Sequence, residues 1–177
     1  MPAKITAARV VRDRKKPVDL GAALVEAFLT NERINQKLID LLDPMVWDGF
    51  PPCSKRRNIG TSFAHIHNVR CMKLKASAGS APERLDRASV TASQARKALG
   101  ESAAAMAALI ESSLEAGGHV KDYRPDVVAF VCSAISHEAH HRGQICHWAR
   151  ELGCPLTPEQ QLQLWEWDKR WKDVVGG

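Results

Sequence analysis

The sequence predicts an all-α fold, a four-helix bundle with a short C-terminal helix. Apolar residues recur at i, i+3 and i+4 in four long blocks, Pro and Gly separate the blocks, and strand signals are almost absent. Four long helices joined by loops of intermediate length are typical of a bundle, which builds metal sites from inward-facing side chains. Since 177 residues is an ordinary domain size, we expect one domain over residues 1–177.

The first two helices are expected at about residues 20–42 and 59–76. Pro44 ends the first helix, and a loop with further Pro and Gly residues leads to the second. The first apolar stripe consists of Leu24, Phe28, Ile34, Leu38 and Leu42. The second consists of Ile59, Ile66, Val69 and Met72. A loop of small residues at 77–89 follows.

Capping signals predict the start of the third helix and of the short last helix. Thr91 and Gln94 have the spacing of a capping box, in which each side chain satisfies a free backbone N–H. Leu99, Met106, Ile110 and Leu114 form the third stripe, which ends before two glycines. The fourth helix is expected at about residues 126–152. Thr157, Pro158 and Gln160 predict one short C-terminal helix, which carries Trp165, Trp167 and Trp171.

The net charge of +5 is concentrated in a run from Arg9 to Lys16 and in Lys55-Arg56-Arg57. Such clusters bind nucleic acid in some proteins and are solvated surface in most. No aromatic residues interleave with these clusters to stack on bases, so we expect no nucleic-acid partner.

The five cysteines form no C-x-x-C pair, which excludes a zinc ribbon or thioredoxin motif. Their odd number and scattered positions indicate reduced thiols in a cytoplasmic protein. The N-terminal residues lack the apolar core of a signal peptide, and no stretch is long and apolar enough to cross a membrane. We therefore expect a cytoplasmic location and no membrane partner.

His137 and His141 are the most informative pair in the chain, because residues four apart lie on the same face of a helix. With 100° per residue, His141 points into the apolar stripe of the fourth helix and His137 borders that stripe. That stripe consists of Phe130, Ala134, Ile145, Trp148 and Leu152. His140 and His147 point away from it. Two core imidazoles can form ordinary hydrogen bonds or share a divalent metal. Because both buried rings need a polar partner, and one metal ion would serve both, we favour the metal.

A third ligand is expected from the second helix, because zinc takes three or four protein ligands. His65 borders the apolar stripe of that helix, whereas His67 points about 150° from its centre. We therefore favour His65 and interpret His67 as a surface or interface residue, with the reverse assignment left open. Imidazole suits zinc, nickel and iron, so the ligand type does not identify the metal.

Three segments resemble motifs of the DinB (damage-inducible, YfiT-like) family. Residues 137–144, His-Glu-Ala-His-His-Arg-Gly-Gln, resemble its last-helix motif, and residues 63–70, Phe-Ala-His-Ile-His-Asn-Val-Arg, resemble its second-helix motif. Residues 31–34, Asn-Glu-Arg-Ile, resemble a weaker pattern of the first helix. The resemblance implies a four-helix bundle, a homodimer, and a divalent metal held by His65, His137 and His141, with water in the open positions.

The resemblance and the ligand set together suggest a metal-dependent enzyme. Three neutral ligands leave open positions, as in catalytic zinc sites. Some branches of the family are thiol-dependent transferases or isomerases, so we expect a transferase that uses a low-molecular-weight thiol, or a hydrolase, acting on a small-molecule substrate. The alternative is a non-catalytic, metal-stabilised interaction protein.

The residues around the ligands identify no catalytic group. We interpret Glu138 and Arg142 as a solvated or interface-facing charge pair rather than as catalytic residues. Gln144 lies on the side of His137 and is a candidate for a hydrogen bond to a ligand.

Overall fold

A computed structural model describes residues 17–54, 56–87 and 89–176, and these residues form helices and loops without a strand. The helices are α1 (Leu20–Leu41), the 3₁₀ helix η1 (Pro44–Val46), α2 (Ile59–Ala78), α3 (Ala92–Glu115), α4 (Val127–Glu151), α5 (Pro158–Gln163) and α6 (Trp167–Val175). The predicted all-α class is confirmed, and the four long helices lie within two residues of their expected bounds. The basic run at 9–16 and Lys55 lie outside the described residues.

Side-chain caps fix where the helices begin. Thr91 and Gln94 form the expected reciprocal capping box at the start of α3, and Thr157 and Gln160 form another at α5. Asn58 caps α2 in the same way. A cap of this kind stabilises a helix by about 1 kcal/mol, because it satisfies backbone N–H groups that have no partner within the helix.

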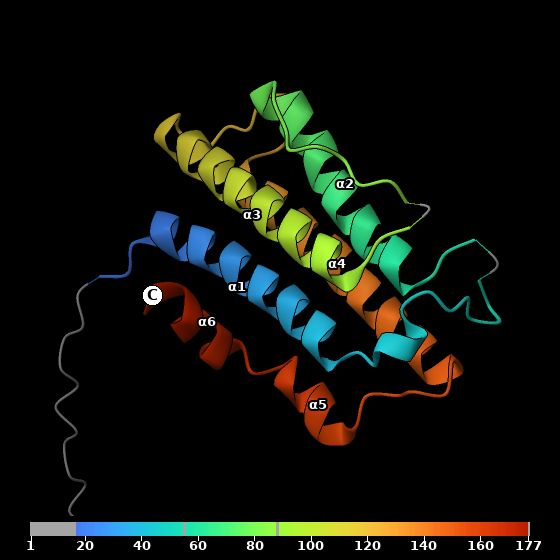
Figure 1. Cartoon of the computed structure of the whole chain (residues 1–177). Coiled ribbons are helices and arrows are strands. Elements are labelled where there is room, and N and C mark those ends of the chain that lie inside the picture. The colour runs from blue at the N-terminus through green and yellow to red at the C-terminus, as the bar shows by residue number, and fades with distance from the viewer. Residues whose placement is uncertain (1–16, 55, 88, 177) are drawn as a thin grey trace, which may run out of the picture.

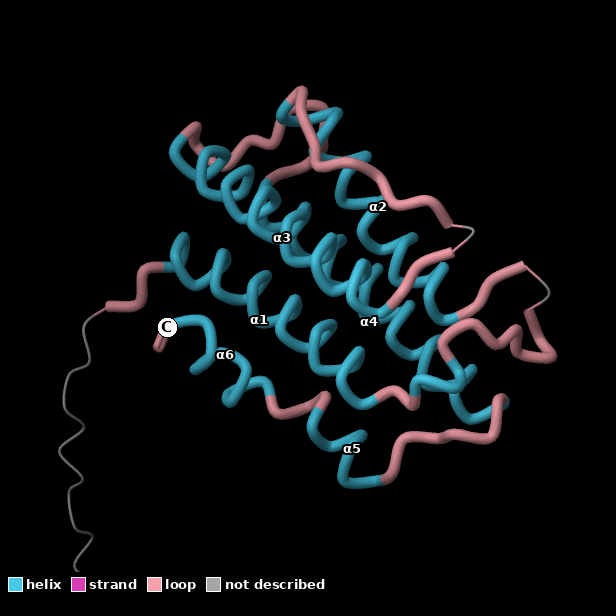
Figure 2. The backbone as a smooth tube through the Cα atoms, in the orientation of Figure 1, coloured by secondary structure: helices cyan, strands magenta, loops and turns pink. Residues whose placement is uncertain are grey.

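The four long helices lie side by side, and the C-terminal segment returns along α1 (Figure 1). α1 packs against α3, α4 and α6, while α2 packs against α3 and α4. The tube in Figure 2 shows that the connections are loops at the ends of these helices. None of the described helices has the length and hydropathy needed to cross a bilayer.

The hydrophobic core is divided into two clusters along the helix axes. One cluster includes Leu38, Phe63, Leu99 and Ile145, and the other includes Phe28, Leu74, Met106 and Phe130. Buried polar residues separate the two clusters on all four long helices. We call these residues, together with the half-buried Arg142, the polar layer: Asn31, Glu32, Asn35, Arg70, Ser102, Glu138 and Arg142.

Two details of the sequence prediction were wrong. The expected single C-terminal helix is two short helices, α5 and α6, because the chain turns at residues 164–166 and α6 then lies along α1. There the Trp171 indole donates a hydrogen bond to Glu26 at 2.8 Å. Met72, assigned to the apolar stripe of the second helix, is 60% exposed, whereas Arg70 and Leu74 face the interior.

Candidate metal centre

Three histidines from two helices converge at one side of α2 and α4. His65 comes from α2, and His137 and His141 come from α4. One ring nitrogen of each lies within 4.8 Å of the others, and the Nε2 atoms of His137 and His141 are 3.2 Å apart. The ring of His65 lies 4.7 Å from that of His141 and 5.3 Å from that of His137, measured between centroids.

This arrangement fits a divalent metal ion. An ion about 2.0–2.1 Å from two imidazole nitrogens in tetrahedral geometry holds those nitrogens about 3.3 Å apart. The 3.2 Å between the Nε2 atoms of His137 and His141 matches that separation. His65 then approaches from the facing helix, so three neutral nitrogen donors surround one point.

Gln144 orients one of the three rings. Its side-chain oxygen accepts a hydrogen bond from Nδ1 of His141 at 2.8 Å. A proton on Nδ1 leaves the lone pair of Nε2 directed toward His137, which is the tautomer that a metal ligand needs. The expected role of Gln144 beside a ligand is therefore supported by its geometry, although its partner is His141.

Burial keeps the three imidazoles neutral at physiological pH. Burial is the largest cause, and together with the neighbouring His141 and His137 it lowers the pKa of His65 to about 4. Burial also lowers the pKa values of His137 and His141. Neutral imidazoles have free lone pairs, so these shifts favour metal binding over protonation.

The remaining histidines lie outside this group. His140 is exposed, although its ring centroid is 5.2 Å from that of His141, and His147 is exposed near the end of α4. His67 is fully buried, and its Nε2 lies 2.8 Å from the carbonyl oxygen of Glu83. The interpretation of His67 as a surface residue was therefore wrong, because the loop after α2 folds back and covers it.

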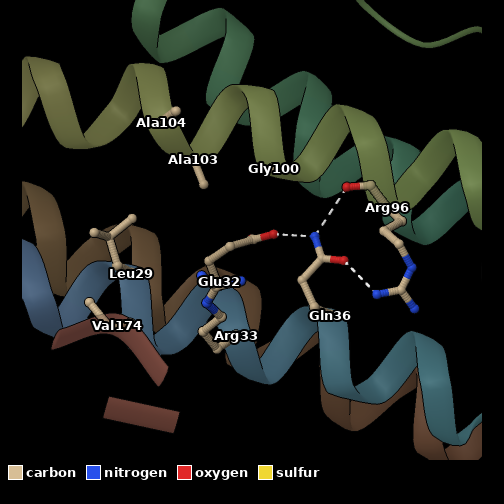
Figure 3. Close-up of a pocket in the computed structure, with 9 residues that line it drawn as sticks. All are labelled: Leu29, Glu32, Arg33, Gln36, Arg96, Gly100, Ala103, Ala104 and Val174. Carbon is tan, nitrogen blue, oxygen red and sulfur yellow. Dashed lines mark hydrogen bonds between the residues drawn. The ribbon is translucent and has the colours of Figure 1, made fainter. Parts of the chain in front are cut away.

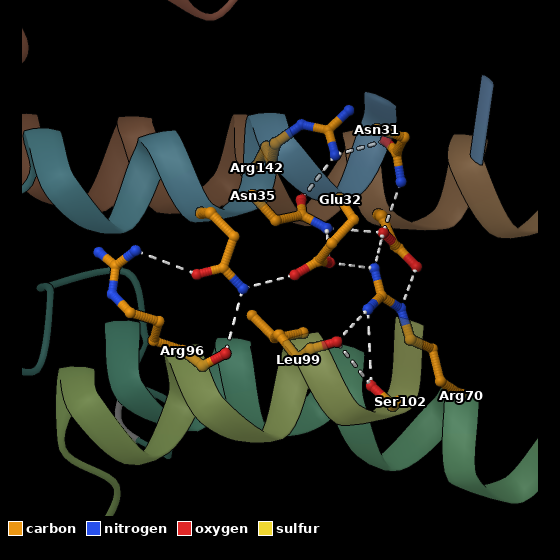
Figure 4. Close-up of polar contacts among 10 residues, drawn as sticks. Asn31, Glu32, Asn35, Arg70, Arg96, Leu99, Ser102 and Arg142 are labelled. Atoms are coloured by element: carbon orange, nitrogen blue, oxygen red, sulfur yellow. Dashed lines mark hydrogen bonds and ion pairs between the residues drawn. The ribbon is translucent and has the colours of Figure 1, made fainter. Parts of the chain in front are cut away.

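Glu138 directly follows His137 in the sequence, and its contacts in the polar layer contradict our interpretation of Glu138 and Arg142. Figure 4 shows Asn31, Asn35, Arg70 and Arg142 of this layer. Glu138 is 1% exposed, and its carboxylate accepts two hydrogen bonds from Arg70, each at 2.7 Å. Asn31 and Asn35 donate to the same carboxylate at 2.6 and 2.7 Å. Arg142 donates to the side-chain oxygens of both asparagines at 2.7 Å. Glu138 is thus buried rather than solvated, and the half-buried Arg142 contacts two asparagines of α1.

The polar layer balances its charges. Arg70 also donates to Glu32 at 2.7 Å and to the Leu99 carbonyl oxygen at 2.9 Å. Burial by itself would raise the pKa of Glu138, but Arg70 and its hydrogen bonds hold that pKa below its ordinary value. Two arginines therefore face two glutamates, and the polar side chains of α1 complete their hydrogen bonds. The sequence contained one sign of this buried polar layer that our sequence prediction did not use. Asn31 and Asn35 lie four residues apart on an otherwise apolar helix face.

A cavity of about 460 Å³ lies between α1, α3 and α6 (Figure 3). Leu29, Arg33, Gly100 and Val174 are among the residues that line it, and none of the three converging histidines does. Glu32 connects the cavity to the polar layer, since one carboxylate oxygen accepts from Gln36 at 2.5 Å and the other from Arg70. The cavity is therefore separate from the three converging histidines.

Comparison with known sequences agrees with the motifs. The DinB family model matches residues 17–170, which include both histidine-bearing helices. No curated protein and no solved structure matches the chain. Because the family match covers most of the chain, this protein belongs to the DinB family.

Proposed function

We propose that this protein is a metal-dependent enzyme, in which a four-helix bundle formed by α1–α4 holds one divalent zinc, nickel or iron ion through His65, His137 and His141. The observation that carries the proposal is the convergence of three imidazole nitrogens within 4.8 Å of one another. Three neutral ligands leave coordination positions open, which is typical of catalytic rather than structural zinc sites.

The chemistry would be activation of a small nucleophile. A divalent ion in this site lowers the pKa of a water or thiol that binds it, so that a nucleophile exists near neutral pH. His65, His137 and His141 hold the ion without neutralising its charge, and Gln144 fixes the orientation of the His141 ring. A transferase that uses a low-molecular-weight thiol fits this site, as does a hydrolase.

Positive side chains around the histidines favour an anionic reactant. Besides burial and the two neighbouring histidines, Arg57 and Arg87 contribute to the lowered pKa of His65, so both guanidinium groups act on that ring. Burial is the main cause of the lowered pKa of His137, which Glu138 opposes and Lys73 reinforces. Such a surrounding attracts thiolates and carboxylates and raises their local concentration.

Two measurements test the proposal. Metal analysis of protein purified without added metal is expected to find at least one divalent ion per chain. Replacing any of the three histidines by Ala is expected to remove one ion. A turnover screen with small thiols and electrophilic acceptors is expected to show activity that a chelator abolishes and added metal restores. Bound metal without turnover on thiol or hydrolytic substrates would contradict the enzymatic part alone.

The second candidate is a metal-stabilised protein that acts by association. Its support is the exposed aromatic surface of the C-terminal segment, where Trp165 is 84% exposed and Trp167 and Trp171 are each about two-fifths exposed. An exposed apolar surface is typical of a protein contact. Metal-dependent melting without turnover would favour this candidate. In either case we propose a cytoplasmic homodimer.

A further inference from the structure

A second group of metal-ligand side chains lies at the C-terminal end of α4. Cys53, His147 and Glu151 each direct one ligand atom to within 4.8 Å of the others. Cys53 comes from the loop between η1 and α2, whereas His147 and Glu151 are four residues apart on α4. Figure 1 shows that this loop and the end of α4 lie at the same end of the molecule.

We propose that Cys53, His147 and Glu151 form a second, surface metal site that takes zinc. The proposal is independent of the proposed enzymatic function, because the two ligand sets share no residue. His147 and Glu151 lie six and ten residues beyond His141, which places them about 9 and about 15 Å further along the helix axis. His147 also points about 120° away from His141 around that axis.

The donor set is that of zinc. Thiolate sulfur, imidazole nitrogen and carboxylate oxygen are the three ligand types that zinc takes in proteins. A thiolate disfavours magnesium, calcium and manganese, which prefer oxygen ligands. The Nε2 of His147 and the Oε1 of Glu151 are 3.3 Å apart, about the separation of two ligands in a tetrahedral zinc site.

The side chains are already associated and accessible. The side chain of His147 is 60% exposed and that of Glu151 is 25% exposed, and Cys53 is exposed. Cys53 and Glu151 act on each other's titration, since Glu151 raises the pKa of the Cys53 thiol and Cys53 lowers the pKa of the Glu151 carboxyl. Zinc binding would displace the thiol proton and connect the loop before α2 to the end of α4. Because the ligand atoms already lie within 4.8 Å of one another, this requires no large movement of the backbone.

Cobalt(II) titration of the full-length, reduced and metal-free protein tests the site. Thiolate ligation to cobalt gives a near-ultraviolet charge-transfer band, which a site of three histidines cannot give. We expect this band in the wild type and in His65→Ala, which removes a ligand of the first site. Cys53→Ser is expected to abolish the band, and the matched control Cys132→Ser, which changes another exposed cysteine, is expected to retain it.

The helical ligands are tested separately. His147→Ala and Glu151→Ala are expected to weaken cobalt binding at the band by at least about tenfold, since the loss of even an outer-shell partner of a ligand costs about 10–100-fold in affinity. Both changes are at surface positions, so the variants retain the fold. The absence of a band, a band that survives Cys53→Ser, or a band whose affinity neither α4 substitution alters would overturn the proposal.

Discussion

The guanidinium of Arg70 and the carboxylate of Glu138 form a two-point contact between α2 and α4, midway along the helices. The side chains are 2% and 1% exposed, so water does not screen the pair. Glu138 directly follows His137 in the sequence, and Arg70 lies on the same helix as His65. The ion pair therefore connects the two helices that carry the histidines, one residue after His137 on α4 and five residues after His65 on α2.

Removal of one partner of this pair is expected to destabilise the protein strongly. Glu138→Ala removes one of the two buried carboxylates that pair with Arg70 and leaves the other, Glu32, to offset its charge. Breaking a buried pair by removing one partner costs about 3–5 kcal/mol. Urea unfolding followed by circular dichroism measures the effect. The exposed pair of Lys97 and Glu101 provides the control, because Glu101→Ala is expected to cost less than about 1 kcal/mol. Similar decreases in the free energy of unfolding for the two variants would contradict the role assigned to Arg70 and Glu138.

The three converging histidines are expected to share one metal ion. Ala at position 65, 137 or 141 removes one of three ligands, so metal content after dialysis should fall sharply in each variant. His140→Ala removes a neighbouring exposed ring and should leave the content at the first site unchanged. Elemental analysis beside protein concentration gives the stoichiometry. An equal loss from His140→Ala would refute the ligand assignment.

Gln144 is expected to strengthen metal binding through its hydrogen bond to His141, without being a ligand itself. Gln144→Ala frees Nδ1 of His141 and lets the ring rotate or change tautomer, and such changes cost about 10–100-fold in affinity. Competition with a chromophoric chelator measures the dissociation constant. Ser136→Ala, a change at an exposed position of the same helix, serves as the control. Unchanged affinity in Gln144→Ala would show that the hydrogen bond does not orient the ligand.

The stabilising effect of the metal should weaken in acid. The unfolded-state pKa of His65 is near 6.5, and burial lowers its folded-state pKa to about 4. Because the folded state binds the proton less readily, the stability that His65 contributes is present above pH 6.5 and is lost as the pH falls toward 4. Burial lowers the pKa values of His137 and His141 in the same direction.

Melting curves with and without a chelator test this dependence. At pH 7.5 the chelator should lower the melting temperature. A metal ion whose free concentration is about one hundred times its dissociation constant stabilises the folded state by about 2.7 kcal/mol. At pH 5 the two curves should approach each other, because protons compete with the ion for the imidazoles. A chelator effect that is absent at pH 7.5, or larger at pH 5, would count against a metal held by histidines.

The protein is expected to form a homodimer. The support is the family resemblance together with the exposed surface that includes Leu162 and Trp165 on the C-terminal segment. Light scattering over a wide concentration range should give twice the mass of the chain, and Trp165→Ser should shift the equilibrium toward the monomer if this surface forms the contact. The monomer mass at every concentration would contradict the prediction.

The sequence by itself determined the elements that depend on local interactions. The helical period of the apolar residues predicted α1–α4. The capping boxes at Thr91 and Thr157 predicted where α3 and α5 begin, because a cap involves residues only three apart. The spacing of His137 and His141 predicted their shared face for the same reason. The face analysis also favoured His65 over His67, and the structure brings His65 to the pair.

Only the tertiary structure decided which polar residues are buried together. Arg70 and Glu138 are 68 residues apart in the sequence, and Asn31 is 107 residues from Glu138. A charged residue on a helix is expected to be solvated unless a partner of opposite charge reaches it from another helix, and the helical period of one segment contains no information about that partner. The burial of His67 likewise depends on a loop that folds back over α2. Local periodicity therefore sets which face of a helix points inward, whereas the pairing of distant helices decides whether a charge on that face can be buried.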